Sequence, residues 1–227
     1  MTLSEAAAWA AVIATLLAVV VALLKEELQA LWRRPKLAGR IRLSAPDCHK
    51  TELTFTDRKT GEIVDHCPCY YFRIWVENIG NLRAKQVQVF VSRLLRKHAD
   101  GTFKEDQQFV PMNLRWAHTH EVFTRGISAK MGRHCDIGYI VPPDKTKQAG
   151  HSLPGVQEGK TIMHLDLEVA PNTRTHLLGP GTYQLLLQLA AENSKPVLKT
   201  LELTLTGDWH DDEARMFSDA VGLRDVS

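Results

Sequence analysis

The chain has 227 residues, of which 44% are hydrophobic and 24% are charged, and its formal net charge is +2 at pH 7. This composition is ordinary for a folded protein and excludes an intrinsically disordered chain. The nearly balanced charge, with no basic residues interleaved among stacking aromatics, argues against a nucleic-acid partner. Four cysteines are too few for a disulfide scaffold in a chain of this length.

An uncharged run of nineteen residues, Ala6 to Leu24, lies near the N-terminus. At about 1.5 Å per residue, a helix of this length crosses most of the roughly 30 Å hydrocarbon core of a bilayer. The run therefore predicts a transmembrane helix with the lipid bilayer as its partner over residues 6–24. A cleaved secretory signal is the alternative, but no Lys or Arg precedes the run and no small-residue cleavage site follows it.

The two flanks of this run differ in charge. The five residues before it carry no Lys or Arg, whereas six basic residues follow between positions 25 and 42: Lys25, Arg33, Arg34, Lys36, Arg40 and Arg42. By the positive-inside rule, the sequence predicts a single-pass protein of the inner (cell) membrane, with its N-terminus outside and its C-terminal domain in the cytoplasm. The residues expected at the membrane interface are Trp9, Trp32, Arg33, Arg34 and Lys36.

Pro35 is expected to end the helix and so to divide the chain into two regions. Residues 1–34 form the transmembrane helix with its juxtamembrane extension, and residues 35–227 form one domain in which the hydrophobic period changes from about four to two. Seven to nine strands separated by short turns predict a mainly β fold, an antiparallel sandwich, rather than a parallel sheet. Asp211 or Asp212 is expected to cap a short C-terminal helix reaching Val221.

The clearest β pattern covers residues 70–91. Tyr70, Phe72, Ile74 and Val76 share one face, and after Asn78-Ile79-Gly80-Asn81 the alternation resumes at Val87, Val89 and Val91. Asn and Gly are expected to supply positive-φ positions in this turn. The strand, the Asn-x-Gly turn, Ala84 and the next strand resemble an Ig-like module of the CARDB type. The resemblance implies an immunoglobulin-like sandwich and adhesion or binding rather than catalysis, although such modules are usually described outside the cell.

Sequence motifs for catalysis are missing from the chain. The segment Gly155 to Lys160 lacks the glycine spacing and the Ser or Thr of a P-loop. No G-x-S-x-G nucleophile elbow and no H-E-x-x-H metal helix occurs. We therefore expect the protein not to be an enzyme and to need no cofactor.

Cysteine and histidine residues offer the one constellation that could carry chemistry. His66, Cys67, Cys69 and Cys135 are zinc-ligand types, and they could form a thiolate site if their loops meet. The spacing Cys67-x-Cys69 is tighter than that of a standard zinc knuckle, and free cysteines also pack as small apolar residues. These residues support the alternative function, a zinc- or thiol-dependent membrane-tethered sensor or enzyme.

The main functional hypothesis is a membrane-anchored protein-interaction or scaffold module that is not catalytic. Tyr71, Arg73 and Trp75 alternate with the apolar residues of their strand and are expected on its other face. Aromatic and Arg side chains are enriched in interface hot spots, so these three residues are the candidate contacts for an unidentified protein partner. The competing interpretation is that Tyr71 and Trp75 pack under a loop or face the second sheet.

Overall fold

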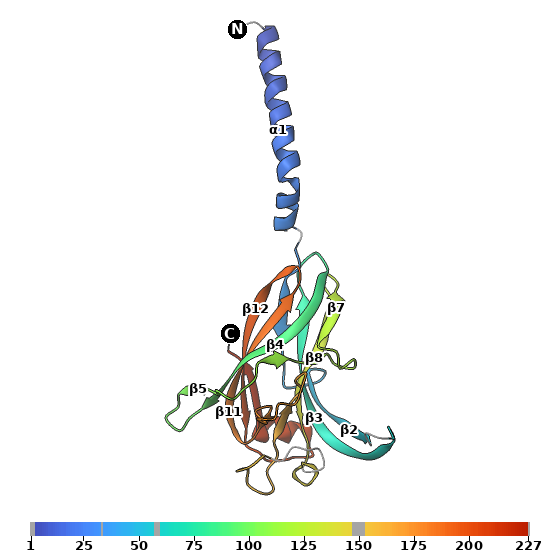
Figure 1. The fold of residues 1–227 in the computed structure, drawn as a ribbon, viewed down its shortest axis with the longest axis vertical. Coiled ribbons are helices and arrows are strands. Elements are labelled where there is room, and N and C mark those ends of the chain that lie inside the picture. The colour runs from blue at the N-terminus through green and yellow to red at the C-terminus, as the bar shows by residue number, and fades with distance from the viewer. Residues whose placement is uncertain (1–2, 33, 57–59, 147–152, 227) are drawn as a thin grey trace.

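The computed structural model describes residues 3–32, 34–56, 60–146 and 153–226, and their side chains except those of residues 3–8, 26–32, 56 and 64. The chain begins with helix α1 (Leu3–Trp32), which extends away from a β domain (Figure 1). Every side chain described in this helix, from residue 9 to residue 25, is exposed. Within the described residues, no helix is both long enough and apolar enough to cross a membrane, so the predicted transmembrane helix is not confirmed.

The β domain consists of two antiparallel sheets packed face to face, which confirms the mainly β sandwich. Sheet A has the strand order β1-β3-β8-β9-β10, with β2 also paired to β3. Its strands are β1 (Leu37–Arg40), β2 (Cys48–Thr56), β3 (Ile63–Asn78), β8 (Gly132–Ile140), β9 (Met163–Leu165) and β10 (Leu177–Leu178).

Sheet B has the strand order β13-β12-β11-β4-β5, and β6 and β7 also pair with β4. Its strands are β4 (Ala84–Lys97), β5 (Phe103–Glu105), β6 (Met112–Asn113), β7 (Phe123–Ile127), β11 (Gly181–Ala191), β12 (Ser194–Leu205) and β13 (Val221–Asp225). The short η1 (Pro143–Lys145) follows β8.

Period-two alternation determines which side chains fill the space between the sheets. On β3, Tyr70, Phe72, Ile74 and Val76 are fully buried, and the odd-numbered positions between them are only half-buried. On β12, Leu201, Leu203 and Leu205 are buried, whereas Leu198 on the opposite face is 72% exposed. The buried side chains of both sheets form one continuous core, because each strand turns its apolar face toward the other sheet.

The turn between β3 and β4 carries the chain from sheet A to sheet B. Its Asn and Gly residues do not adopt positive φ, so that prediction is wrong; the nearest left-handed residue is Gln86, with φ 49°. Gly80 is required for a different reason. A Cβ atom at this position would lie 2.4 Å from the carbonyl oxygen of Arg34, because the segment that follows α1 packs directly on the turn.

The C-terminal segment only partly forms the expected helix. The Asp212 carboxylate accepts a hydrogen bond from the Arg215 amide and caps α2 (Glu213–Arg215), as predicted. The chain continues through the π-helical η2 (Met216–Ala220), and Val221 then begins β13. The helix ends before Val221 because residues 221–225 pair with β12 at the edge of sheet B.

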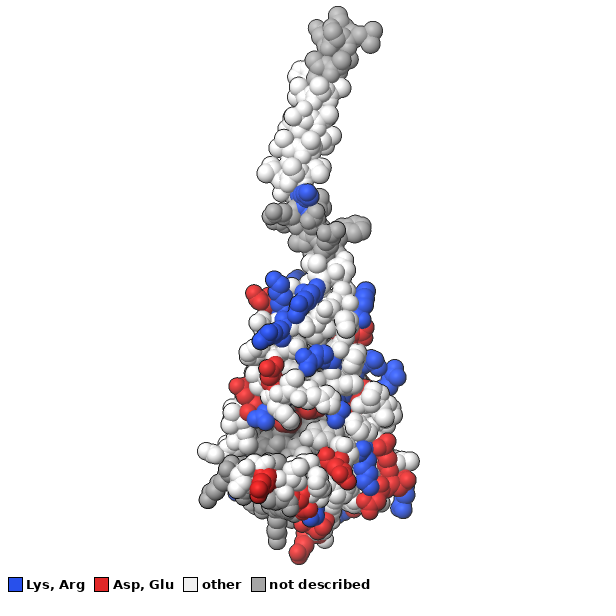
Figure 2. Space-filling model, turned by 90° about the vertical axis from the view of Figure 1, so that its right-hand side faces the viewer, with Lys and Arg blue, Asp and Glu red and all other residues white. Residues whose placement is uncertain are grey.

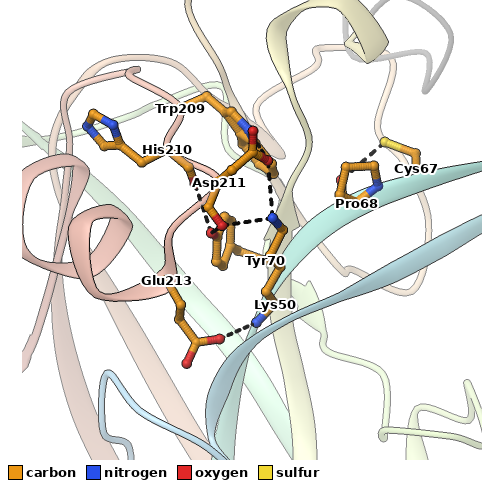
Figure 3. A network of polar contacts seen from close by, with 8 residues as sticks. All are labelled: Lys50, Cys67, Pro68, Tyr70, Trp209, His210, Asp211 and Glu213. Atoms are coloured by element: carbon orange, nitrogen blue, oxygen red, sulfur yellow. Dashed lines mark hydrogen bonds and ion pairs between the residues drawn. The ribbon is translucent and has the colours of Figure 1, made fainter.

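A polar network fixes this C-terminal segment to the β2–β3 hairpin (Figure 3). The Lys50 amide donates to Glu213, and its ammonium group donates to the Asp211 backbone and carboxylate at 2.8 and 3.1 Å. The Tyr70 hydroxyl donates to the carbonyl oxygen of His210 at 2.8 Å. These contacts join sheet A to the segment that leads into the edge strand of sheet B.

Candidate functional site

The three candidate contacts lie together on the outer face of sheet A, the face turned away from sheet B. Tyr71, Arg73 and Trp75 are successive odd-numbered residues of β3, so the pleat places them on one side, as the sequence predicted. All three are half-buried rather than fully exposed. Side chains of β8 contribute to this burial, because Tyr139 packs on Tyr71 and His134 packs on Trp75.

Arg73 is held by a buried acidic partner. Its Nε atom lies 3.2 Å from Oδ1 of Asp136, whose side chain is only 6% exposed. The two groups form an ion pair, in which they attract each other as opposite charges. The guanidinium carbon also lies 5.3 Å from the ring centroid of Tyr71, within the range of a cation–π interaction.

Four rings continue from Tyr71 across sheet A, and we call them the aromatic row: Tyr71, Tyr139, His164 and His176. Strand register brings Tyr139 of β8 opposite Tyr71 on one side and opposite His164 of β9 on the other. Successive ring centroids are 5.3, 4.9 and 5.1 Å apart. The row forms an aromatic strip next to the Arg73 guanidinium, in which His176 is buried and the other three rings are half-buried.

Trp75 belongs to a second group at the other end of this face. Its ring lies 4.8 Å from that of His134, whose Nε2 atom is 2.9 Å from Oδ1 of Asp47. The Arg40 guanidinium carbon lies over the Trp75 ring at 5.7 Å. A Cβ at Gly132 would lie 2.4 Å from the Trp75 ring, so the indole packs directly against the backbone of β8.

Two acidic side chains beneath this face have altered proton affinities. Burial raises the pKa of the Asp136 carboxyl to about 7, and the nearby Arg73 charge opposes that shift only in part. Burial also raises the pKa of Asp166, against the attraction of Arg115 and His120. The charge of the outer face therefore changes near neutral pH.

The zinc-ligand set is not brought together in the structure. Cys67 and Cys69 pack with Val141 on the outer side of sheet A, whereas Cys135 belongs to the core between the sheets. His66 is exposed and lies 3.5 Å from the Thr54 hydroxyl. Among the described residues, no group of three or more His, Cys, Asp or Glu side chains is arranged to hold a metal ion.

The cysteines are poor nucleophiles in their present surroundings. Burial raises the pKa of the Cys69 thiol to about 12 and that of Cys135 well above its ordinary value. Only the thiolate attacks or binds metal, so a raised pKa lowers reactivity. Their positions fit packing as small apolar residues.

The residues expected at the membrane interface lie on α1 and at its junction with the sandwich. Trp9 is 64% exposed on α1. Arg34 and Lys36 are exposed in the segment between α1 and β1. The side chain of Trp32 and all of Arg33 lie outside the described residues.

Several residues that shape this region were not selected from the sequence. Asp136, Tyr139 and His164 come from strands whose register against β3 depends on contacts distant in the chain. The alternation of β8 could not have placed Asp136 and Tyr139 on one face, because an even and an odd position share it only through the register shift between β3 and β8. It could not have shown that Asp136 lies across from Arg73.

A pocket of about 620 Å³ lies away from this face. Its lining includes Arg96, Tyr183, Thr175 and the loop residues 153–157. None of the side chains selected from the sequence lines it. The candidate face is one side of a β-sheet, and such a surface suits a macromolecular contact better than a small ligand.

Comparison with protein-family models, with curated proteins and with solved structures finds no match for this chain.

Proposed function

We propose that this protein is a membrane-anchored, non-catalytic protein-interaction module, held by α1 and recognising its partner through the outer face of sheet A. The observation that carries the proposal is the contrast between the two parts of the chain. The sandwich closes its own core without α1, and the described side chains of α1 are all exposed. Such an apolar helix needs an apolar environment that the domain does not provide.

The membrane anchor is supported by sequence and backbone together. The uncharged run of residues 6–24 lies entirely within α1, which has 30 residues. The structure describes the side chains of this run from residue 9 onward. Leu16, Leu17 and Leu23 are 60%, 59% and 75% exposed. The basic residues after the helix support an inner-membrane location with the sandwich in the cytoplasm.

The interaction role is supported by the chemistry of the outer face. Tyr71, Arg73 and Trp75 are the residue types that dominate interface hot spots, and contacts with side chains of β8 hold them in place before any partner binds. A preordered face loses less side-chain entropy on binding. The CARDB-type resemblance of residues 70–91 adds to this proposal an immunoglobulin-like sandwich and a binding role.

Site-specific photo-crosslinking in the full-length protein tests the proposal. A photoreactive phenylalanine analogue replaces Trp75 on sheet A, and in a second variant it replaces Leu198, which is 72% exposed on sheet B. Both variants are illuminated in intact cells, and crosslinked proteins are isolated from the membrane fraction. We expect a discrete adduct from position 75.

Position 198 is a demanding control because it is the more accessible site on the opposite face. Adducts from position 198 alone would contradict the assignment of the face. Failure of both positions to capture a protein would contradict the interaction role.

A further inference from the structure

The segment that follows α1, residues 34–36, is held on the sandwich by hydrogen bonds around Asn78, which is fully buried. Its Oδ1 atom accepts from the amides of Lys36 and Gly80, both at 3.1 Å. Its Nδ2 atom donates to the carbonyl oxygens of Leu82 and Ile127, at 2.6 and 3.0 Å. One side chain thus ties the segment after α1 to the β3–β4 turn and to β7.

Further contacts hold the same segment. The amide of Asn81 donates to the carbonyl oxygen of Arg34 at 3.3 Å. The Ser194 hydroxyl, at the start of β12, donates to the carbonyl oxygen of Pro35 at 3.3 Å. The segment from Arg34 to Lys36 is therefore docked against two turns, so this end of the sandwich has a fixed position next to the segment that leads from α1.

Six basic side chains gather at this end, and we call them the basic end: Arg34, Lys36, Arg83, Lys85, Lys130 and Lys195. All six are exposed. Hydrogen bonds join the elements that carry them, because Asn193 links to the backbone of Arg83 and Lys85, and Lys130 donates to the carbonyl oxygen of Ile79. Across the described part of the chain, none of the six forms an ion pair with an acidic side chain.

The distribution of charge over the domain is uneven. Figure 2 shows Lys and Arg gathered on the part of the sandwich nearest to α1, while most Asp and Glu side chains on this face lie farther away. A pocket of about 610 Å³ lies at the basic end, lined by Arg34, Lys36 and Lys195, with Glu192 as the acidic residue in its lining. The end next to α1 thus offers cations to a negatively charged surface and a recess for one headgroup.

We propose that the basic end docks on anionic phospholipid headgroups of the membrane that holds α1, so that the sandwich stands in a defined orientation on the bilayer. This inference rests on the membrane anchor proposed above. Cations near an anionic leaflet are attracted within about one Debye length, roughly 8 Å at physiological salt. Hydrogen bonds of Asn78 and Ser194 hold the basic end beside the segment that follows α1, and the outer face of sheet A remains available to a protein partner.

Fluorescence quenching in lipid nanodiscs tests the proposal on the full-length protein. The four native cysteines are buried, so a cysteine introduced by Pro196→Cys at the basic end can be labelled selectively, and Gln107→Cys provides a label far from it. Nanodiscs contain either phosphatidylcholine or an equimolar mixture of phosphatidylcholine and phosphatidylglycerol, each with a headgroup-linked nitroxide quencher. We expect several-fold stronger quenching at position 196 in the anionic nanodiscs, with no change at position 107.

Charge variants separate docking from simple tethering. Lys85→Gln combined with Lys195→Gln should abolish the extra quenching, as should high salt, whereas Lys104→Gln combined with Arg215→Gln should retain it. Equal quenching at position 196 in both lipids, with the chain inserted, would overturn the docking and leave the anchor standing. A chain that does not enter the nanodiscs at all would overturn both.

Discussion

At the scale of single residues, Asn78 is the side chain on which most local order depends. It is fully buried and uses all four of its hydrogen-bonding positions on backbone groups of three different segments. The Asn-x-Gly sequence thus has a structural role that its turn chemistry alone does not reveal. Asn78 forms hydrogen bonds with backbone groups of the turn, and the missing side chain of Gly80 lets the segment after α1 pack against the turn.

Asn78→Ala should lower the free energy of unfolding by about 4 kcal/mol, because each of four broken hydrogen bonds contributes about 1 kcal/mol. Asn193→Ala is the matched control, since Asn193 bonds to backbone at the same end of the sandwich but is exposed. Water can replace its contacts, so a loss below about 1 kcal/mol is expected. Urea unfolding of the full chain in detergent, followed by tryptophan fluorescence, measures both; equal losses would contradict the role of Asn78.

Asp136 should make stability depend on pH. Burial raises its pKa in the folded protein to about 7, above the ordinary value of 3.8, so between these values the folded state binds more protons than the unfolded state. The free energy of unfolding therefore falls as pH rises through this interval. Asp136→Asn should remove this contribution, which unfolding measurements at several pH values compare directly. Parallel curves for the two proteins would contradict the assignment.

At the scale of elements, alternation predicted the main strands because one face of each meets the core. The faces of β3, β11 and β12 follow from their sequences, as does the position of Tyr71, Arg73 and Trp75 on one side. The short strands β5, β6 and β10 have only two or three residues, too few to show a period. Their pairing is decided by neighbours that are distant in the chain.

Which residues meet on the outer face of sheet A also depends on a strand register that the sequence does not reveal. The register of β3 against β8 shifts between Phe72 and Arg73, so Arg73 lies across from Asp136 and not from Ile137. A one-residue bulge of this kind exchanges the two faces of a strand. No local pattern in the sequence marks it, so the ion pair could not be predicted.

Two leucines of β12 test the assignment of faces. Leu203→Asp should prevent folding, because Leu203 is 1% exposed and an unpaired buried charge costs several kcal/mol against a total stability of about 5 to 15 kcal/mol. Leu198→Asp, on the same strand at 72% exposure, should change stability by less than about 0.5 kcal/mol. Circular dichroism should show β structure only for the second variant. A folded Leu203→Asp protein would contradict the packing.

For the molecule as a whole, the proposed orientation in the membrane rests on the charges that flank the apolar run. A reporter that works only in the cytoplasm should be active when fused after Ser227, because six basic residues follow the apolar run and none precedes it. Replacing Arg33, Arg34, Lys36 and Arg40 with neutral residues should weaken the signal. Activity of a reporter that works only outside the cytoplasm would show the opposite orientation.

Extraction of membranes with alkaline carbonate tests the proposal that α1 holds the sandwich in a membrane. The full-length protein should stay in the membrane pellet. Leu16→Asp combined with Val20→Asp should move it to the supernatant, because each central charge costs about 3 kcal/mol in the bilayer. Leu198→Asp, which alters an exposed residue of the sandwich, should stay in the pellet. Recovery of the folded wild-type protein in the supernatant would contradict the anchor.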